Sequence, residues 1–145
     1  MSAAALEAGI CINNSSVTVV HGMSRPIGAL FHVPHGLSNA MLLEKCMKFA
    51  YDGALERFAD LAFAVGVAEK GDSPLCAAEK FVFALGALCK ECNVPTISEY
   101  GIDAAEFEKA IPKMTADALA SGSPQNTRKN VSKDDAEKIY KSLIM

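Results

Sequence analysis

The most regular pattern in the sequence is a row of residues between 75 and 92 that alternates spacings of three and four. This spacing places every member on one face of an α-helix, whereas a strand would need alternation with period two. Ser73 and Pro74 come directly before the row, and a serine cap followed by proline at the first helical position is a typical helix start. The pattern predicts a helix with one face made of Leu75, Ala78, Val82, Leu85, Cys89 and Cys92.

Helical patterns account for most of the remaining sequence. Residues 103–106 and 132–135 resemble capping boxes, each at the start of a further helix. Pro112 should kink or divide one of these helices, and the prolines and glycines of residues 24–34 predict a short apolar loop. Residues 16–20 have local β propensity, but no stretch alternates long enough for a sheet. We therefore predict an all-α bundle of about six helices in one domain, residues 1–145, with helices at 3–23, 37–50, 55–65, 74–92 and 104–119 and a last helix that ends near Leu143.

Charge and composition narrow the functional classes. The net charge is -3 and the 14 basic residues are scattered, so we predict no nucleic-acid partner. The longest apolar runs, residues 61–68 and 81–89, are shorter than the about 18 residues that cross a bilayer, and no targeting segment precedes them, so we expect a cytoplasmic protein. Five cysteines without framework spacing indicate reduced thiols, with Cys11, Cys46 and Cys76 expected in the core.

All three histidines, His21, His32 and His35, lie close together in the sequence. Imidazoles from a helix end and from the loop that follows it can converge on one metal ion. Histidines are also ordinary polar residues at helix ends. The spacing alone therefore leaves metal binding and a structural role open.

The residues around these histidines resemble the signature of a known family. The segments are Val20-His21-Gly22-Met23, Pro26-Ile27-Gly28-Ala29, Pro34-His35-Gly36 and Ser38-Asn39-Ala40-Met41-Leu42-Leu43. In this order and spacing they resemble the iron-containing alcohol dehydrogenases, where a histidine late in a helix and another in a Pro-His-Gly turn bind the metal. The resemblance implies that His21 and His35 are metal ligands. It also implies the helical C-terminal domain of the dehydroquinate synthase-like fold.

An activity follows from the same resemblance. Members transfer hydride between NAD(P) and a small alcohol or aldehyde, with Fe(2+), or Zn(2+) in related members, acting as a Lewis acid on the substrate oxygen. An N-terminal domain, absent from this sequence, would bind NAD or NADP and supply an aspartate and a histidine as further ligands. The sequence contains no glycine-rich phosphate-binding motif and no Asp-x-x-x-His. We therefore assign no catalytic and no cofactor-binding residue to the chain and expect it to be inactive alone; dimers are common in the family.

Several positions leave alternatives open. Arg25 stands where many members carry another histidine, and it either contacts a phosphate or carboxylate or caps the C-terminus of its helix. His32 is a weaker candidate for lining the cleft. Thr127 replaces the proline of an Asn-Pro-Arg turn whose role the sequence does not define. Cys89 and Cys92 form a CxxC that fits packing better than half of a zinc site or a redox pair.

Two other functions compete with this interpretation. The first is a free-standing helical interaction module derived from the dehydrogenase, with its histidines as relics. The second is a zinc-dependent polyol dehydrogenase of the same superfamily. The coding sequence upstream would test the first, and metal analysis of the full-length protein would test the second.

Overall fold

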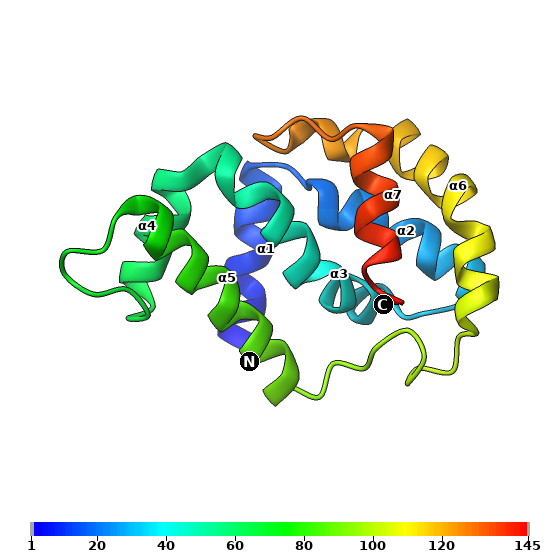
Figure 1. Cartoon of the computed structure of the whole chain (residues 1–145), viewed down its shortest axis with the longest axis horizontal. Helices are drawn as coiled ribbons and strands as arrows, with labels where there is room; N and C mark the ends of the chain where they lie inside the picture. The colour runs from blue at the N-terminus through cyan, green and yellow to red at the C-terminus, as the bar shows by residue number, and fades with distance from the viewer. Residues whose placement is uncertain (1, 145) are drawn as a thin grey trace.

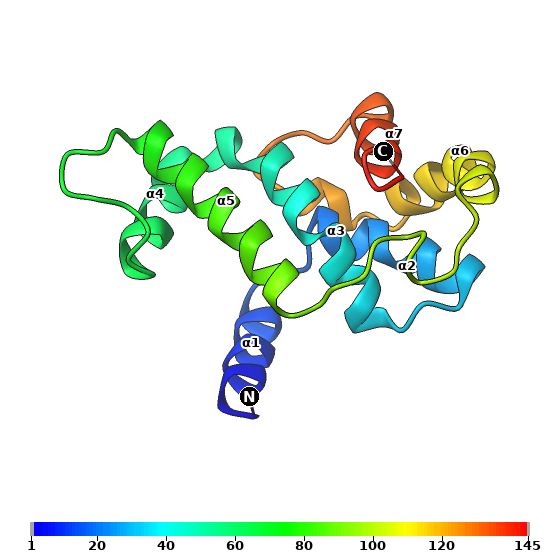
Figure 2. The same ribbon diagram turned by 60° about the horizontal axis from the view of Figure 1, so that its bottom comes forward.

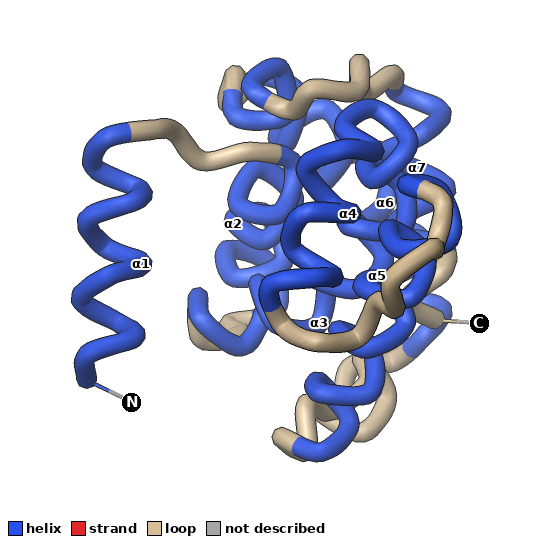
Figure 3. Tube along the Cα trace, turned by 90° about the vertical axis from the view of Figure 1, so that its left-hand side faces the viewer, coloured by secondary structure: helices blue, strands red, loops and turns tan. Residues whose placement is uncertain are grey.

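The structure is a computed structural model that describes residues 2–144. All regular elements in that range are helices, as Figure 3 shows, so the all-α prediction is confirmed. Figure 1 shows their arrangement, and in chain order they are α1 (Ser2–Asn14), α2 (Val19–Phe31), α3 (His35–Ala50), η1 (Tyr51–Ala54), α4 (Leu55–Ala64), α5 (Pro74–Glu91), α6 (Ala104–Ala120), η2 (Ser123–Asn126) and α7 (Lys133–Lys141).

The helix predicted at 3–23 is in fact two helices. The chain leaves helical geometry after α1, and Thr18 is extended, with φ -119° and ψ -154°. Ser15, Ser16 and Thr18 compete with helix formation through their hydroxyl groups and favour caps and turns. The prediction of one continuous helix is therefore wrong, because α1 and α2 are separate helices.

The loop predicted at 24–34 is also wrong, because α2 runs through most of it and contains Pro26. Burial outweighs the poor helix propensity of this segment, since Met23 and Ile27 are fully buried. The helix ends at His32, whose φ of 55° is left-handed. Only the short stretch between α2 and α3 is a loop.

The main core is built around α2. This helix packs against α3, α6 and η2, and α6 in turn packs against α7. Phe107 of α6 stacks on Phe31 with ring centroids 5.5 Å apart and meets the ring of Tyr140 edge-on at 6.2 Å. The hydroxyl of Tyr140 donates a 2.7 Å hydrogen bond to the Met23 carbonyl of α2. Burial raises the pKa of Tyr140, so the hydroxyl stays protonated and joins the last helix to the central one.

The last two helices begin where the sequence predicts. Asp103 caps α6 by accepting a 2.9 Å hydrogen bond from the Glu106 amide. Ser132 and Asp135 form a complete capping box at the start of α7. Between these points α6 continues without interruption through Pro112, so the expected division of this helix does not occur.

A second, smaller unit consists of α4 and α5. These helices pack on each other around Ala59, Ala62 and Ala77, and α5 also packs on α3. Because small side chains make this contact, larger side chains of α5 remain exposed to solvent. Leu75, on the predicted inner face of α5, is 49% exposed, and Phe83 is 81% exposed. The predicted helical period is therefore correct, but the predicted buried face is correct only in part.

The first helix projects from the bundle. Figures 2 and 3 show α1 separated from α2 by a short loop and standing apart from the other helices. None of its side chains is buried, and Leu6 and Ile10 are 67% and 54% exposed. Within residues 2–144 no single helix is long and apolar enough to cross a membrane; α1 and α2 meet that test only as a pair, and they are bent by 107°.

The hydrogen bond from Tyr140 gives a test of the core. The substitution Tyr140→Phe keeps the ring and removes the hydroxyl, so we expect the free energy of unfolding to fall by about 1 kcal/mol, the net value of a typical buried hydrogen bond. Urea unfolding followed by circular dichroism measures this change. Tyr51→Phe, in η1, is the matched control and should change stability by less than about 0.5 kcal/mol; equal losses in both variants would show that the Tyr140 hydrogen bond contributes nothing specific.

Candidate metal centre

The two predicted ligands lie next to each other although they come from different helices. His21 is in the first turn of α2, and His35 is the first residue of α3. Their ring centroids are 5.4 Å apart and their planes are inclined by 54°. The expected position of His21 near the end of a helix is wrong, because α2 begins at Val19. The expected convergence of the two rings is present.

The separation of the rings fits a shared divalent ion. With metal–nitrogen bonds of about 2.1 Å and a tetrahedral angle, the centres of two bound imidazoles lie about 5 Å apart. Imidazole nitrogen is a ligand for iron(II) and zinc alike. Residues 2–144 contain no group of three or more His, Cys, Asp or Glu side chains that could hold an ion. His21 and His35 therefore fit two positions of a coordination sphere whose other donors come from elsewhere.

The surroundings of His21 favour its neutral form. Burial lowers its pKa below the usual value, and the charges of His35 and Arg25 lower it further. A neutral imidazole retains the lone pair that a metal ion needs. The ring is therefore ready to act as a ligand at neutral pH without first losing a proton.

Asn39 contacts His35 from one turn further along α3. Its side-chain nitrogen lies 2.8 Å from the His35 carbonyl oxygen and 3.1 Å from His35 Nε2. Because an amide nitrogen only donates, Nε2 is the acceptor in this arrangement and the ring proton of neutral His35 is on Nδ1. An ion that binds Nε2 must displace the Asn39 amide. The neighbouring Asn39 Oδ1 is buried and has no hydrogen-bond partner within residues 2–144.

Residues near the C-terminus fix the start of α2. The N-cap residue Thr18 makes no capping hydrogen bond with its own side chain. Instead, the Val19 amide donates a 3.0 Å hydrogen bond to Oγ1 of Thr127. Asn126 donates to the Ser16 hydroxyl at 2.8 Å and to the Val17 carbonyl at 3.0 Å. The turn that the sequence left without a role therefore sets the position of the helix that carries His21.

Gly22, the neighbour of His21, allows α2 to approach η2 closely. A Cβ atom at this position would lie 2.7 Å from the Pro124 side chain and 3.3 Å from Cβ of Ser123. Real Cβ atoms essentially never come as close as the first of these distances. Glycine is therefore needed at this position because of space.

The other two candidate residues lie further along α2. Arg25 is exposed and donates a 3.1 Å hydrogen bond to Oγ of Ser123 in η2. It lies well before the end of α2 at Phe31, so its interpretation as a C-terminal cap is wrong. His32 is exposed at that end, and within residues 2–144 no hydrogen bond or ring contact joins it to the His21–His35 pair.

A hollow of about 460 Å³ borders His21 on the side of α1. Its walls come from α1, the following loop, α2 and α3, and they include His21 and Asn39. Apolar side chains such as Val20, Leu43 and Met47 form much of the remaining wall, and no acidic side chain lines it. The imidazole of His21 therefore faces space that a small, mostly apolar molecule or another segment could fill.

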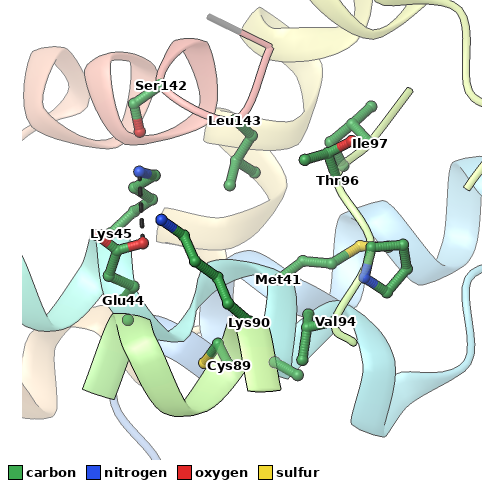
Figure 4. A pocket seen from close by; sticks show the side chains of 13 residues that line it. Met41, Glu44, Lys45, Cys89, Lys90, Val94, Thr96, Ile97, Ser142 and Leu143 are labelled. Atoms are coloured by element: carbon green, nitrogen blue, oxygen red, sulfur yellow. Dashed lines mark ion pairs between the residues drawn. The ribbon is translucent and has the colours of Figure 1, made fainter. Parts of the chain in front are cut away.

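A second hollow, of about 250 Å³, lies between α3, α5 and the end of α7 (Figure 4). Glu44 and Lys45 form an ion pair at its edge, with Nζ and Oε2 3.5 Å apart, and Cys89 and Lys90 reach it from α5. No histidine lines it. This hollow is separate from the histidine pair.

The cysteines add no donor set to the described part of the chain. Cys89 is half-buried and Cys92 is exposed at the end of α5, so the packing role predicted for this CxxC is wrong for Cys92. Of the three cysteines expected in the core, Cys46 is buried, Cys76 is half-buried and Cys11 is exposed. Burial raises the pKa of the Cys46 thiol to about 12, so this side chain acts as a small apolar residue.

The sequence matches a family profile described as the C-terminal part of the Fe-containing alcohol dehydrogenase family, over residues 1–144. Among curated proteins, it is 34% identical to 1,3-propanediol dehydrogenase from Citrobacter freundii, over 94% of this chain. It is 29% identical to NADPH-dependent butanol dehydrogenase from Clostridium saccharobutylicum, also over 94% of this chain. The chain spans 35% of the length of each of these relatives.

A solved structure shares the fold. Alcohol dehydrogenase from Oenococcus oeni superposes with a TM-score of 0.84 at 29% identity, over 93% of this chain and 34% of that one. The helical arrangement described above is therefore that of the corresponding part of a longer dehydrogenase.

The contact between Thr127 and the start of α2 gives a second test. Thr127→Val keeps the shape of the side chain but leaves the Val19 amide without its acceptor, which should lower the free energy of unfolding by about 1–2 kcal/mol. Thr127→Ser retains the hydroxyl and should keep most of the stability. Urea unfolding of both variants measures the effect. If the valine variant is as stable as the serine variant, another group satisfies the Val19 amide.

Proposed function

The chain belongs to the Fe-containing alcohol dehydrogenase family, and from this we propose that it is the C-terminal metal-binding part of an oxidoreductase that transfers hydride between NAD(P) and a small alcohol or aldehyde. Support comes from the relatives, whose names include dehydrogenases of butanol and 1,3-propanediol. One of them is named as NADPH-dependent and another, from Bacillus methanolicus, as NAD-dependent. The names of the relatives therefore do not decide between NAD and NADP.

The observation that carries the metal-binding role is the convergence of His21 and His35. Their rings approach to 5.4 Å between centroids from the first turns of two packed helices. We assign both as ligands of one Fe(2+), with Zn(2+) as the alternative that a zinc-dependent polyol dehydrogenase of the same superfamily would use. When bound, the ion supplies Lewis-acid stabilisation of the substrate oxygen. The chain's own part is to hold the two imidazoles in place, with His21 beside a mostly apolar hollow.

In our proposal, the cofactor-binding domain and the other metal ligands are not part of this chain. We assign the whole chain, 1–145, to one helical domain and place the NAD(P)-binding domain, with an aspartate and a histidine ligand, on polypeptide that precedes it in the intact enzyme. The chain's coverage of only 35% of two relatives supports this division. The cysteines are free thiols, which supports a reducing compartment, and we place the enzyme in the cytoplasm.

The ligand assignment predicts a specific metal-binding pattern. On titration of Zn(2+) into the 15N-labelled chain at pH 7.5, the ring resonances of His21 and His35 should shift together, with one ion per chain. Affinity should be weak because only two protein donors are present. His21→Gln and His35→Gln should each weaken binding at least roughly tenfold, a loss seen even when outer-shell partners are removed.

His32→Gln is the matched control for this titration, because it removes the third imidazole and leaves the pair intact. It should bind Zn(2+) as the unchanged chain does. Zinc that binds with equal affinity to all four proteins, or that shifts the His32 resonances alone, would rule out the assigned ligands.

Because we place the NAD(P)-binding domain on other polypeptide, we predict that the chain has no dehydrogenase activity alone. With Fe(2+) or Zn(2+), NAD or NADP, and a panel of short alcohols and aldehydes, the absorbance of the reduced nicotinamide should not change, since hydride transfer needs a positioned cofactor. Turnover that is lost in His21→Gln and His35→Gln would instead show that the chain is a complete enzyme.

A further inference from the structure

The side-chain amide of Asn39 directs both of its hydrogens at His35. Its Nδ2 atom lies 2.8 Å from the His35 carbonyl oxygen and 3.1 Å from Nε2 of the same residue. The first contact identifies the atom, because a carbonyl oxygen only accepts and the group beside it must therefore be the amide nitrogen. The second hydrogen then faces Nε2, which accepts it with its lone pair.

This contact selects the ring nitrogen that can bind an ion. A neutral imidazole has one protonated nitrogen and one nitrogen with a free lone pair. The donor at Nε2 places the ring proton of His35 on Nδ1, so Nε2 is the nitrogen that keeps a lone pair. Asn39 therefore both selects the ligating atom of His35 and occupies it.

Asn39 belongs to the surroundings of both histidines. It lines the hollow that also borders His21, and the His21 ring lies 5.4 Å from the ring of His35 between centroids. In the described part of the chain, the contact with Asn39 is the one hydrogen bond found at the His35 ring. A change at Asn39 should therefore reach the His35 ring directly.

Stability does not account for this placement of the amide. Oδ1 of Asn39 is buried and has no hydrogen-bond partner within residues 2–144, which costs free energy in the folded protein. Asn14 on α1 provides a comparison, because its amide donates to the Ile10 carbonyl four residues earlier, also at 2.8 Å, while the residue remains exposed. The bond to a carbonyl thus forms without a histidine, and the contact with Nε2 is the distinguishing feature of Asn39.

We propose that Asn39 is a positioning residue that competes with the metal ion for Nε2 of His35. In the metal-free protein its amide holds this nitrogen, and it gives the nitrogen up to the ion while it keeps its bond to the His35 carbonyl. A bond made only in the metal-free form stabilises that form and so lowers the affinity for the ion. This inference rests on the proposed function and adds a control on how the same site is loaded.

The first test measures the position of the ring proton. In the metal-free chain with 15N-labelled histidine at pH 8, His35 should give the 15N shift of an unprotonated nitrogen at Nε2 and of a protonated one at Nδ1. In Asn39→Ala this pattern should move toward that of the exposed His32, which is the internal reference. Asn39→Asp offers only acceptors at this pH, so it should draw the proton to Nε2.

The second test measures zinc affinity. Asn39→Ala should bind Zn(2+) about two- to tenfold more tightly than the unchanged chain, the range that the net value of one hydrogen bond gives. Circular dichroism should show that Asn39→Ala keeps its helices, because the substitution also removes the buried Oδ1.

Asn14→Ala is the matched control for both tests. It removes the same kind of bond between a side chain and a carbonyl on the projecting helix α1. The ring proton of His35 and the zinc affinity should both stay as they are in the unchanged chain.

Two outcomes would overturn the proposal. One is a His35 ring proton that stays on Nδ1 to the same extent in Asn39→Ala and Asn39→Asp. The other is Asn39→Ala that binds zinc no more tightly than the unchanged chain, which would count against this inference alone. Ring protons that follow Asn39 as expected, in a chain that does not bind zinc at His21 and His35, would instead refute the metal-binding role and the competition together.

Discussion

The placement of α2 is the constraint on which the rest of the molecule depends. Its buried face supplies Met23 and Ile27 to the main core, and its first turn carries His21. The start of the helix is fixed from far along the chain, by the hydrogen bond between the Val19 amide and Thr127. A backbone amide at a helix start has no partner within the helix, so a distant side chain can set where the helix begins. The local sequence and the C-terminal turn together therefore position the first imidazole.

Most of the helical fold could be predicted from the sequence, because apolar period and capping residues act locally. The Asp103 cap of α6, the capping box of α7 and the Ser-Pro start of α5 are at the predicted positions. The errors cluster around α2, where Pro26 and Gly28 indicate a loop but burial in the core maintains a helix. Local propensity cannot show which segment other helices will surround.

The sequence indicated which residues to examine for a site but not how they are arranged in space. Family resemblance indicated His21 and His35, while their placement in the first turns of α2 and α3 required the structure. Asn39 contacts His35, and Thr127 accepts a hydrogen bond from the Val19 amide. Both contacts depend on how the chain folds, which a single sequence does not reveal. The Asn-Thr-Arg resemblance was the one signal that pointed toward the second of these contacts.

The tight contact between Gly22 and Pro124 means that the geometry of the candidate site also depends on a residue without a side chain. Any larger residue at position 22 would act as a wedge between α2 and η2, since a single added carbon would already lie 2.7 Å from the proline ring. The wedge would tilt the adjoining imidazole out of register with its counterpart on α3. A missense change at a residue with no functional group of its own would then alter how the two histidine rings face each other.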